Sequence, residues 1–386
     1  MRVVLAPDSF RGSLHAPEVC DALAAGVRAA RPDSLTTAVP MADGGEGTLD
    51  RLLSAWGGRE VVRVVPGPLG RPVAARYGLL RGGAAAVVEL AAASGLAALE
   101  GAAPDPLQAS TRGTGELVLD AVSRGAREVV VCVGGSASTD GGSGLLAALG
   151  FRVLDDHGRV LPDGGAALRH AASVDADEVP ETVRAARFRV ACDVTNPLLG
   201  PRGAAAVFAP QKGAGPEDVA LLEAGLSRWA EVLGRTAEAA GGPGPQEIAG
   251  APGSGAAGGT AAGLVALLDA AAVPGAELVA DAVGLAGALA GADLVLTGEG
   301  RLDEQTADGK VVSVVCRLAR AAGVPAVAVA GGVGGSLAGL HAAGLTAAFS
   351  LADGPRSLDD LLAAARDLLA AAAEQVVRLH GWRAAA

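Results

Sequence analysis

Short apolar runs alternate with helical patterns and polar loops along this chain. The first run, at residues 2–7, precedes a loop and a segment in which apolar residues recur every four positions from Val19 to Val27. This order predicts a strand, a loop and a helix. The run at residues 36–41 precedes the loop ADGGEG and a helical pattern over residues 48–56. The repetition predicts an α/β fold with polar loops at the ends of strands.

The pattern is less regular between about residues 61 and 272, where we expect a second domain. Polar and apolar residues alternate there in a way that predicts a helix from Pro216 to about Ala237. The following residues 240–259 are rich in glycine and proline, which is typical of either a surface loop or a crossover. Near the carboxyl end, Ser357 caps a final amphipathic helix. Further strand-like runs lie at residues 61–65, 85–90, 128–135, 187–194, 293–300 and 324–332.

Two domains are expected because 386 residues exceed the size at which one hydrophobic core keeps growing. The first and last thirds of the chain both have the pattern of a doubly wound parallel sheet, whose ligand loops lie at the carboxyl ends of the strands. We therefore expect these thirds to form one domain that is split by an insertion.

Composition narrows the functional classes. Half of the residues are hydrophobic, and the net charge of −11 disfavours binding to nucleic acid or to an anionic membrane. The four cysteines form no CxxC pair, which favours a reducing cytoplasm over a zinc site or a disulfide framework. The amino terminus has too few apolar residues before Asp8 for a signal peptide, and no stretch has the pattern of a membrane span.

Five glycine-containing loops follow apolar runs and carry the candidate chemistry: residues 6–14, 41–48, 134–144, 192–200 and 297–310. Glycine lets backbone amides approach a phosphate, and neighbouring carboxylates bind a divalent metal or accept a proton. Phosphoryl transfer uses these parts together. Asp8, Asp43, Asp193 and Glu299 are the leading acids because each stands where a strand gives way to a loop. Any one such loop is also ordinary turn chemistry, and Asp140 could equally be a helix cap.

Lysine is rare: of 31 basic residues only Lys212 and Lys310 are lysines, and both fall in polar loops where an ammonium group reaches phosphate oxygens. The chain has no GxxxxGK[ST], HExxH or GxSxG motif, which disfavours a P-loop enzyme, a metalloprotease and an α/β-hydrolase. One GxGxxG, residues 253–258, does not follow an apolar strand, so a dinucleotide fingerprint is disfavoured.

The sequence resembles the bacterial glycerate kinases that phosphorylate D-glycerate at the 2-hydroxyl. APDSFRGSL, MADGGEGT, GTGELVLDA, GGSASTDGGSG, CDVTNPLLGPRGAAAVFAPQKGA and GEGRLDEQTADGK carry the resemblance, in the order of the family. It implies ATP as co-substrate, Mg²⁺ as metal and D-glycerate as acceptor. It also implies a Rossmann-like domain of residues 1–66 and 274–386, an inserted α/β domain of residues 67–273, and an active site in the cleft between them.

Four departures from the family pattern are visible. Arg11 stands where a lysine is usual, and an arginine offers a planar fork in place of a point donor. Thr139 replaces a common asparagine, Ala209 replaces a glycine, and KVVSVV lacks the usual proline and glycine. These departures bear on fine specificity more than on the class of reaction.

On this resemblance we expect Asp193 or Asp8 to deprotonate the glycerate hydroxyl, and Arg11 and Lys212 to balance the charges of carboxylate and phosphoryl group. Glu299 and Asp303 are the expected ligands of Mg²⁺. Substrate or nucleotide binding is expected at Ser9, Ser13, Asp43, Gly44, Gly45, Glu46, Gly47, Ser136, Asp140, Thr195, Asn196, Gly298, Gln305, Thr306 and Lys310.

Two alternatives remain at this point. Arg11 would suit a non-catalytic or altered-specificity relative that binds a hydroxy acid, and the GxGxxG motif would suit a nucleotide-dependent oxidoreductase. The partners expected are glycerate and ATP, without nucleic acid or membrane, and the protein is expected to be a monomer or a homodimer.

Overall fold

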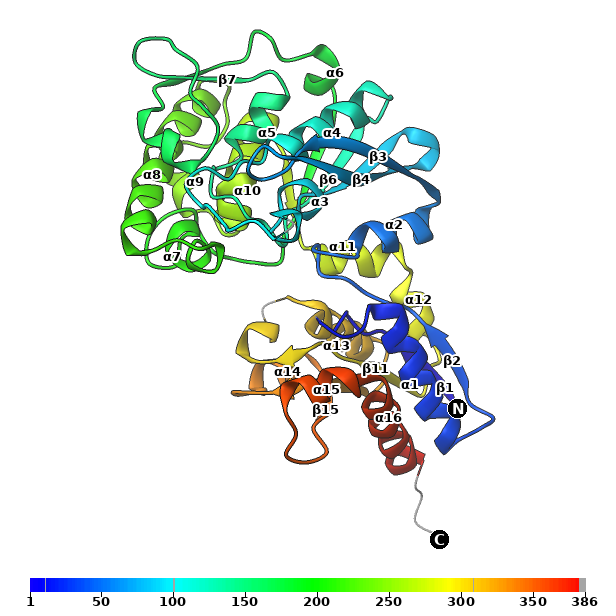
Figure 1. Ribbon diagram of the computed structural model, residues 1–386. Coiled ribbons are helices and arrows are strands. Elements are labelled where there is room, and N and C mark those ends of the chain that lie inside the picture. Colours follow the sequence, from blue (N-terminus) through cyan, green and yellow to red (C-terminus); the bar gives the residue numbers. More distant parts are fainter. Residues whose placement is uncertain (11, 100, 308, 382–386) are drawn as a thin grey trace. The chain divides into compact units, whose positions relative to one another are not determined.

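The computed structural model describes residues 1–10, 12–99, 101–307 and 309–381. The chain folds into two compact units, each with a sheet of its own (Figure 1). The first unit contains residues 1–43 and 274–386, and the second contains residues 44–273. Within the described ranges, no helix is both long enough and apolar enough to cross a bilayer.

The first unit is built on a parallel sheet with the strand order β15-β13-β11-β1-β2. Its central pair is β1 with β11, in which Val3 lies beside Leu294. Val4 and Val295 point to one face of the sheet, while Val3 and Leu294 point to the other, and both faces are buried. The strands are β1 (Arg2–Leu5), β2 (Leu35–Ala38), β11 (Leu294–Thr297), β13 (Ala326–Ala330) and β15 (Leu345–Ser350).

Helices cover both faces of this sheet. Helices α1 (Ala16–Ala30) and α16 (Ala365–Gly381) pack against each other on one face (Figure 1). The opposite core contains residues of α11 (Gly275–Ala282), α12 (Leu285–Leu289), α13 (Val311–Ala321) and α14 (Ala338–Ala343). A short two-stranded sheet pairs β12 (Arg301–Leu302) with β14 (Gly332–Val333).

The final helical segment is divided in two. As expected, Ser357 caps a helix, since its hydroxyl accepts a hydrogen bond from the Asp360 amide at 3.1 Å. This helix, α15 (Leu358–Ala363), ends at Ala363, and α16 follows as a separate helix. The expectation of one continuous closing helix was therefore wrong.

The second unit has a mixed sheet with the strand order β10-β9-β6-β5-β4-β3. Strands β5, β6, β9 and β10 are parallel to one another, whereas β3 and β4 are antiparallel to their neighbours. The strands are β3 (Gly58–Pro66), β4 (Pro72–Leu80), β5 (Ala85–Glu89), β6 (Glu128–Cys132), β9 (Arg187–Ala191) and β10 (Ala271–Val273). The longer helices are α2 (Thr48–Trp56), α4 (Arg112–Ser123), α8 (Pro216–Ala239) and α10 (Ala256–Leu268).

The first boundary between the units lies earlier than the sequence pattern indicated. We expected the first segment to extend to Pro66, but β3 pairs with β4 along its whole length, from Gly58 beside Leu80 to Pro66 beside Pro72. Residues 44–66 consequently belong to the second unit.

The glycine- and proline-rich residues 240–259, for which we expected a surface loop or a crossover, contain regular secondary structure. They contain the short helix α9 (Pro245–Gly250) and continue into α10. A Cβ atom at Gly258, inside the GxGxxG motif, would lie 2.3 Å from the carbonyl oxygen of Ser138. Close packing between neighbouring segments accounts for this glycine.

The packing of α1 against α16 yields a first prediction. A Cβ atom at Gly26 would lie 2.1 Å from the carbonyl oxygen of Ala370, so Gly26→Ala forces the two helices apart. We expect a loss of about 1–3 kcal/mol in the free energy of unfolding, measured by urea denaturation. Gly287→Ala, in α12 with no atom within 4 Å, is the matched control and should not destabilise. Equal stability of the two variants would contradict this packing.

Candidate active site

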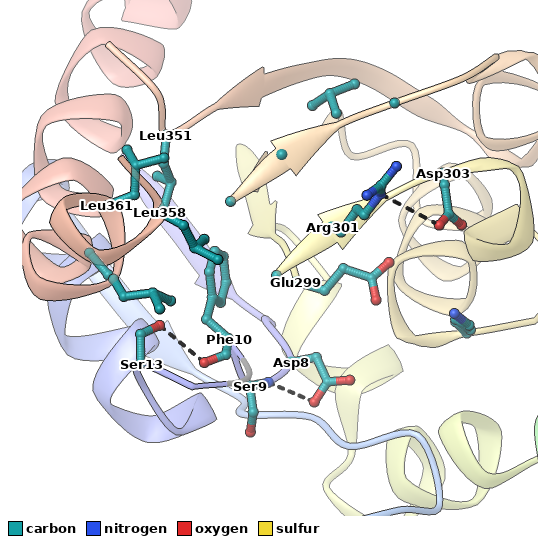
Figure 2. Close-up of a pocket in the computed structure, with 18 of the residues that line it drawn as sticks. Asp8, Ser9, Phe10, Ser13, Glu299, Arg301, Asp303, Leu351, Leu358 and Leu361 are labelled. Atoms are coloured by element: carbon teal, nitrogen blue, oxygen red, sulfur yellow. Dashed lines mark hydrogen bonds and ion pairs between the residues drawn. The ribbon is translucent and has the colours of Figure 1, made fainter. Parts of the chain in front are cut away.

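A cavity of about 700 Å³ lies in the first unit beside the carboxyl ends of β1, β11 and β13 (Figure 2). Loops that follow parallel strands meet at one edge of a sheet, which is why segments far apart in sequence line the same cavity. It brings together seven of the predicted site residues: Asp8, Ser9, Ser13, Asp43, Glu299, Asp303 and Lys310.

Glu299 is the most constrained acid of this cavity. Burial raises the pKa of its carboxyl group, and the nearby charges of Asp43 and Asp303 raise it further. The Thr306 hydroxyl donates a hydrogen bond to the Glu299 carboxylate. This hydrogen bond and the positive charge of Lys310 both lower the pKa of Glu299. The Oε1 atom of Glu299 is buried and has no hydrogen-bond partner among the described residues. Such an arrangement costs stability and is typical of functional sites.

Thr306 also orders the loop around Asp303. Its fully buried hydroxyl accepts a hydrogen bond from the Asp303 amide at 3.2 Å, within the turn that leads to α13. The predicted binding residue Thr306 therefore holds the two expected metal ligands, Glu299 and Asp303, in one loop.

Close backbone contact places Asp8 beside the β11 loop. The Asp8 amide donates to the carbonyl of Gly298 at 2.8 Å. A Cβ atom at Gly298 would lie 1.9 Å from the carbonyl oxygen of Val329, so this position requires glycine for its approach to β13. Ser9 and Ser13 belong to the same turn, where the Ser13 hydroxyl donates to the carbonyl of Phe10 at 3.0 Å.

Among the described residues that line it, the cavity has more acidic than basic side chains. These acids are Asp8, Asp43, Glu299 and Asp303, and the described basic residues are Arg301 and Lys310. Lys310 is the cap residue at the amino end of α13, where the helix dipole also favours an anion. A polyphosphate would meet net negative charge here unless a cation accompanied it.

Several other predicted residues belong to the second unit, most of them in the loop before α2 and in the loops that follow β6 and β9. Gly44, Gly45, Glu46 and Gly47 precede α2. A Cβ atom at Gly134 would lie 2.6 Å from the Cα atom of Gly45, so this loop packs directly on the end of β6. The contact explains two glycines of the predicted loops by close approach of backbones.

Glu89 lies at the same edge and was not predicted from the sequence. It is the last residue of β5, is only 6% exposed, and its Oε1 atom accepts from the Leu49 amide at 2.9 Å, at the start of α2. Burial raises the pKa of its carboxyl group, while this backbone hydrogen bond lowers it. The available signal was a single acid near the end of the apolar run at residues 85–90.

Asp140 joins the starts of two helices. It is fully buried, and its carboxylate accepts hydrogen bonds from the amide and hydroxyl of Thr111, each at 2.8 Å, and from the amides of Gly142 and Gly144 at 3.2 Å. Burial raises the pKa of this carboxyl group, and the hydrogen bonds oppose that effect. Asp140 thus links α4 to the helix α5 (Ser143–Ala148), as the capping alternative predicted.

Lys212 is likewise an interior residue. Its ammonium group is buried and donates to the Ser136 hydroxyl at 2.8 Å and to the carbonyl of Ser138. Burial lowers the pKa of Lys212 to about 7, and the charge of Asp140 opposes the shift. The lysine fixes the loop at residues 134–144, so Ser136 is engaged by the protein itself.

The loop after β9 holds three more predicted residues. Asp193 and Asn196 are half-buried, and Thr195 is exposed. The Asn196 side chain donates to the carbonyl of Arg202 at 2.8 Å. Arg11 lies outside the described residues, and Gln305 is described only as part of the 3-10 turn Glu304–Ala307.

No group of three or more His, Cys, Asp or Glu residues arranged to hold a metal occurs in the described part of the chain. Mg²⁺ is commonly held by one or two carboxylates together with substrate phosphates. Glu299 and Asp303, with the buried Oε1 atom of Glu299 lacking a partner among the described residues, fit that mode.

The described loop geometry occurs in a sequence that matches the model of the Glycerate kinase family over residues 3–381. The chain belongs to the glycerate kinase family. A glycerate kinase of Halalkalibacterium halodurans is 40% identical over 380 residues, which cover 98% of each chain. A glycerate 2-kinase of Escherichia coli K12 is 38% identical over 376 residues, which cover 97% of each.

A solved structure agrees with this membership of the glycerate kinase family. A crystal structure assigned to glycerate kinase 2 of Salmonella typhimurium LT2 has a TM-score of 0.81 and 41% identity, and the match covers 98% of both chains. The resemblance inferred from the motifs is thereby confirmed, and the mixed α/β fold class with it.

Charge burial at Glu299 yields a second prediction. Folding raises the pKa of Glu299, so the free energy of unfolding falls as the pH rises through the folded-state pKa and the buried carboxylate ionises. Glu299→Gln removes the charge and with it this loss of stability. We expect Glu299→Gln to unfold roughly 2–4 °C higher than the parent at pH 8, with a smaller gain at pH 5. Glu277→Gln, at a half-buried acid paired with Arg317 on the surface, is the control and should change little. A lower unfolding temperature for Glu299→Gln at pH 8 would contradict the buried charge.

Proposed function

We propose that this chain transfers the γ-phosphoryl group of ATP to the 2-hydroxyl of D-glycerate and forms 2-phospho-D-glycerate. The supporting observation is the cavity of the first unit, which gathers Asp8, Asp43, Glu299, Asp303 and Lys310 in a member of the glycerate kinase family. The Escherichia coli relative that is named glycerate 2-kinase favours the 2-hydroxyl as acceptor.

The acidic cavity implies a divalent cation. Glu299 and Asp303 would hold Mg²⁺, which neutralises phosphate charge during transfer when it is bound. Lys310 and the amino end of α13 present positive charge to the same phosphates. Thr306 keeps the two carboxylates in place through its hydrogen bonds.

Proton transfer needs a carboxylate that can reach the acceptor hydroxyl. Asp193 or Asp8 takes the proton of the 2-hydroxyl group. The hydroxyl oxygen of glycerate attacks the γ-phosphorus of ATP, and the bond between that phosphorus and the leaving ADP oxygen breaks. Arg11 is retained as the residue that balances the substrate carboxylate. Lys212, which is buried against Ser136 and Ser138, is assigned instead to positioning the glycine loop.

The finer architecture follows the same proposal. The parallel sheet of the first unit is proposed to be a Rossmann-like nucleotide domain, because its strands are covered on both faces and its polar loops follow the carboxyl ends. The protein is proposed to act in a reducing cytoplasm, in keeping with a sequence whose four cysteines form no CxxC pair. The protein is proposed to act as a monomer or homodimer.

The proposed reaction is tested by coupled detection of ADP with D-glycerate and MgATP. We expect turnover at a rate typical of kinases, roughly 1–100 per second, and L-glycerate serves as the control acceptor. Phosphorus NMR of the product distinguishes the 2-phosphate from the 3-phosphate. Absence of ADP formation would favour a non-catalytic relative, and NAD(P) binding in its place would favour an oxidoreductase.

The role of Asp193 is tested by Asp193→Asn, which keeps the shape of the side chain and removes the base. We expect kcat to fall about 10²–10⁴-fold. Asp177→Asn, at an exposed acid of the same unit, is the matched control. If Asp193→Asn kept kcat within a few fold of the parent, Asp8 would be the remaining candidate.

A further inference from the structure

The cavity of the first unit has a second end with a different chemistry. Phe10, Leu351, Leu358, Leu361 and Leu362 line it, and we name this group the apolar end. Figure 2 shows Leu351, Leu358 and Leu361 gathered with Phe10 on one side, while Glu299 and Asp303 lie on the other. One cavity therefore offers hydrocarbon at one end and charge at the other.

Helix α15 provides most of the apolar end. Leu358, Leu361 and Leu362 stand at positions i, i+3 and i+4, so they share one face of the helix, and all three line the cavity. The helix starts at the Ser357 cap, and Leu361 packs against the core that contains Phe10 and Leu351. This core therefore holds Leu361 in place.

Leu358 lines the cavity but is largely exposed to solvent. The residue is 69% exposed, although it lines the same cavity as the buried Phe10. Val333, another lining residue, is 41% exposed. Large apolar side chains kept at solvent around a hollow are a feature of ligand sites.

The part of the lining at and beside β14 is largely bare backbone. Gly331, Gly332 and Gly334 line the cavity. A Cβ atom at Gly331 would lie 2.4 Å from the carbonyl oxygen of Gly300, so the packing of this wall against the β11 loop requires glycine there. Backbone without side chains leaves room for a flat ring.

We infer that the apolar end binds the nucleobase of the phosphoryl donor. Its phosphates would be bound by Lys310 and, through Mg²⁺, by the carboxylates. This inference rests on the proposed function, which supplies a nucleoside triphosphate as donor. A cavity of about 700 Å³ is of the size that holds a small cofactor. The continuity of the two ends matches a ligand with a flat apolar ring at one extreme and charge at the other.

The test is isothermal titration of ATP in the presence of Mg²⁺ to the full-length parent and to Leu358→Asn. Asparagine adds no charge, and the exposed position tolerates it. We expect the Kd for ATP to rise roughly tenfold, since apolar contact with the base is lost. Inorganic tripolyphosphate, which has the phosphates without the base, should bind both proteins with similar affinity.

Leu379→Asn is the matched control, because Leu379 is a 70% exposed leucine of the same unit that does not line the cavity. It should bind ATP as the parent does. The inference is overturned if ATP binds the parent and Leu358→Asn equally, if ATP and tripolyphosphate weaken to the same extent, or if the parent does not bind ATP. Binding is read without turnover, so a parent that binds ATP through Leu358 but leaves glycerate unchanged would refute only the proposed reaction.

Discussion

The pairing of β1 with β11 is the interaction on which the cavity depends. It joins segments 291 residues apart, as in the hydrogen bond from the Thr297 hydroxyl to the carbonyl of Ala6 at 2.8 Å. Asp8 follows one strand and Glu299 follows the other, so the parallel register delivers both acids to one edge. An antiparallel pairing would have sent them to opposite ends of the sheet.

Glycine and buried charge then act together at that edge. Gly298 and Gly331 allow backbones to approach more closely than any side chain would permit, and the approach encloses the Glu299 carboxylate. The loops after β1, β2 and β11 therefore concentrate the negative charges of Asp8, Asp43, Glu299 and Asp303 where the fold gains nothing from them. A ligand that carries a cation would relieve this repulsion, which connects the instability of the site to its proposed use.

Local pattern was sufficient for several elements and for the positions of three of the four leading acids along one cavity. The helix Thr48–Trp56 has the expected bounds, and Asp8, Asp43 and Glu299 line one cavity as their positions after strands suggested. The same pattern was insufficient where burial decides the role. Asp43 and Asp140 both begin a D-G-G-x-G segment, yet Asp43 lines the cavity while Asp140 is fully buried beneath two helix starts.

Tertiary pairing set the other limits on prediction. Residues 58–66 form β3, which pairs with β4 of the second unit. A hydrophobic run does not reveal its pairing partner, so we placed the boundary between the units too late in the sequence. Glu89 was missed because it is the last residue of a strand, whereas the candidate residues were sought in the glycine-containing loops. Both lysines fall in polar loops of the sequence, which does not reveal that Lys212 is buried whereas Lys310 lines the cavity.

The discontinuity of the first unit also has a consequence for synthesis on the ribosome. Strand β1 emerges first, but β11, which completes one of its two edges, emerges only after residues 44–273. The paired positions are 291 residues apart, so at translation rates of about 5–20 residues per second that edge waits roughly 15–60 s for its partner. The second unit, which is continuous in sequence, is free to fold during this interval. The nascent chain thus passes through a stage with one folded unit and an open, apolar strand edge, the kind of surface that chaperones shield.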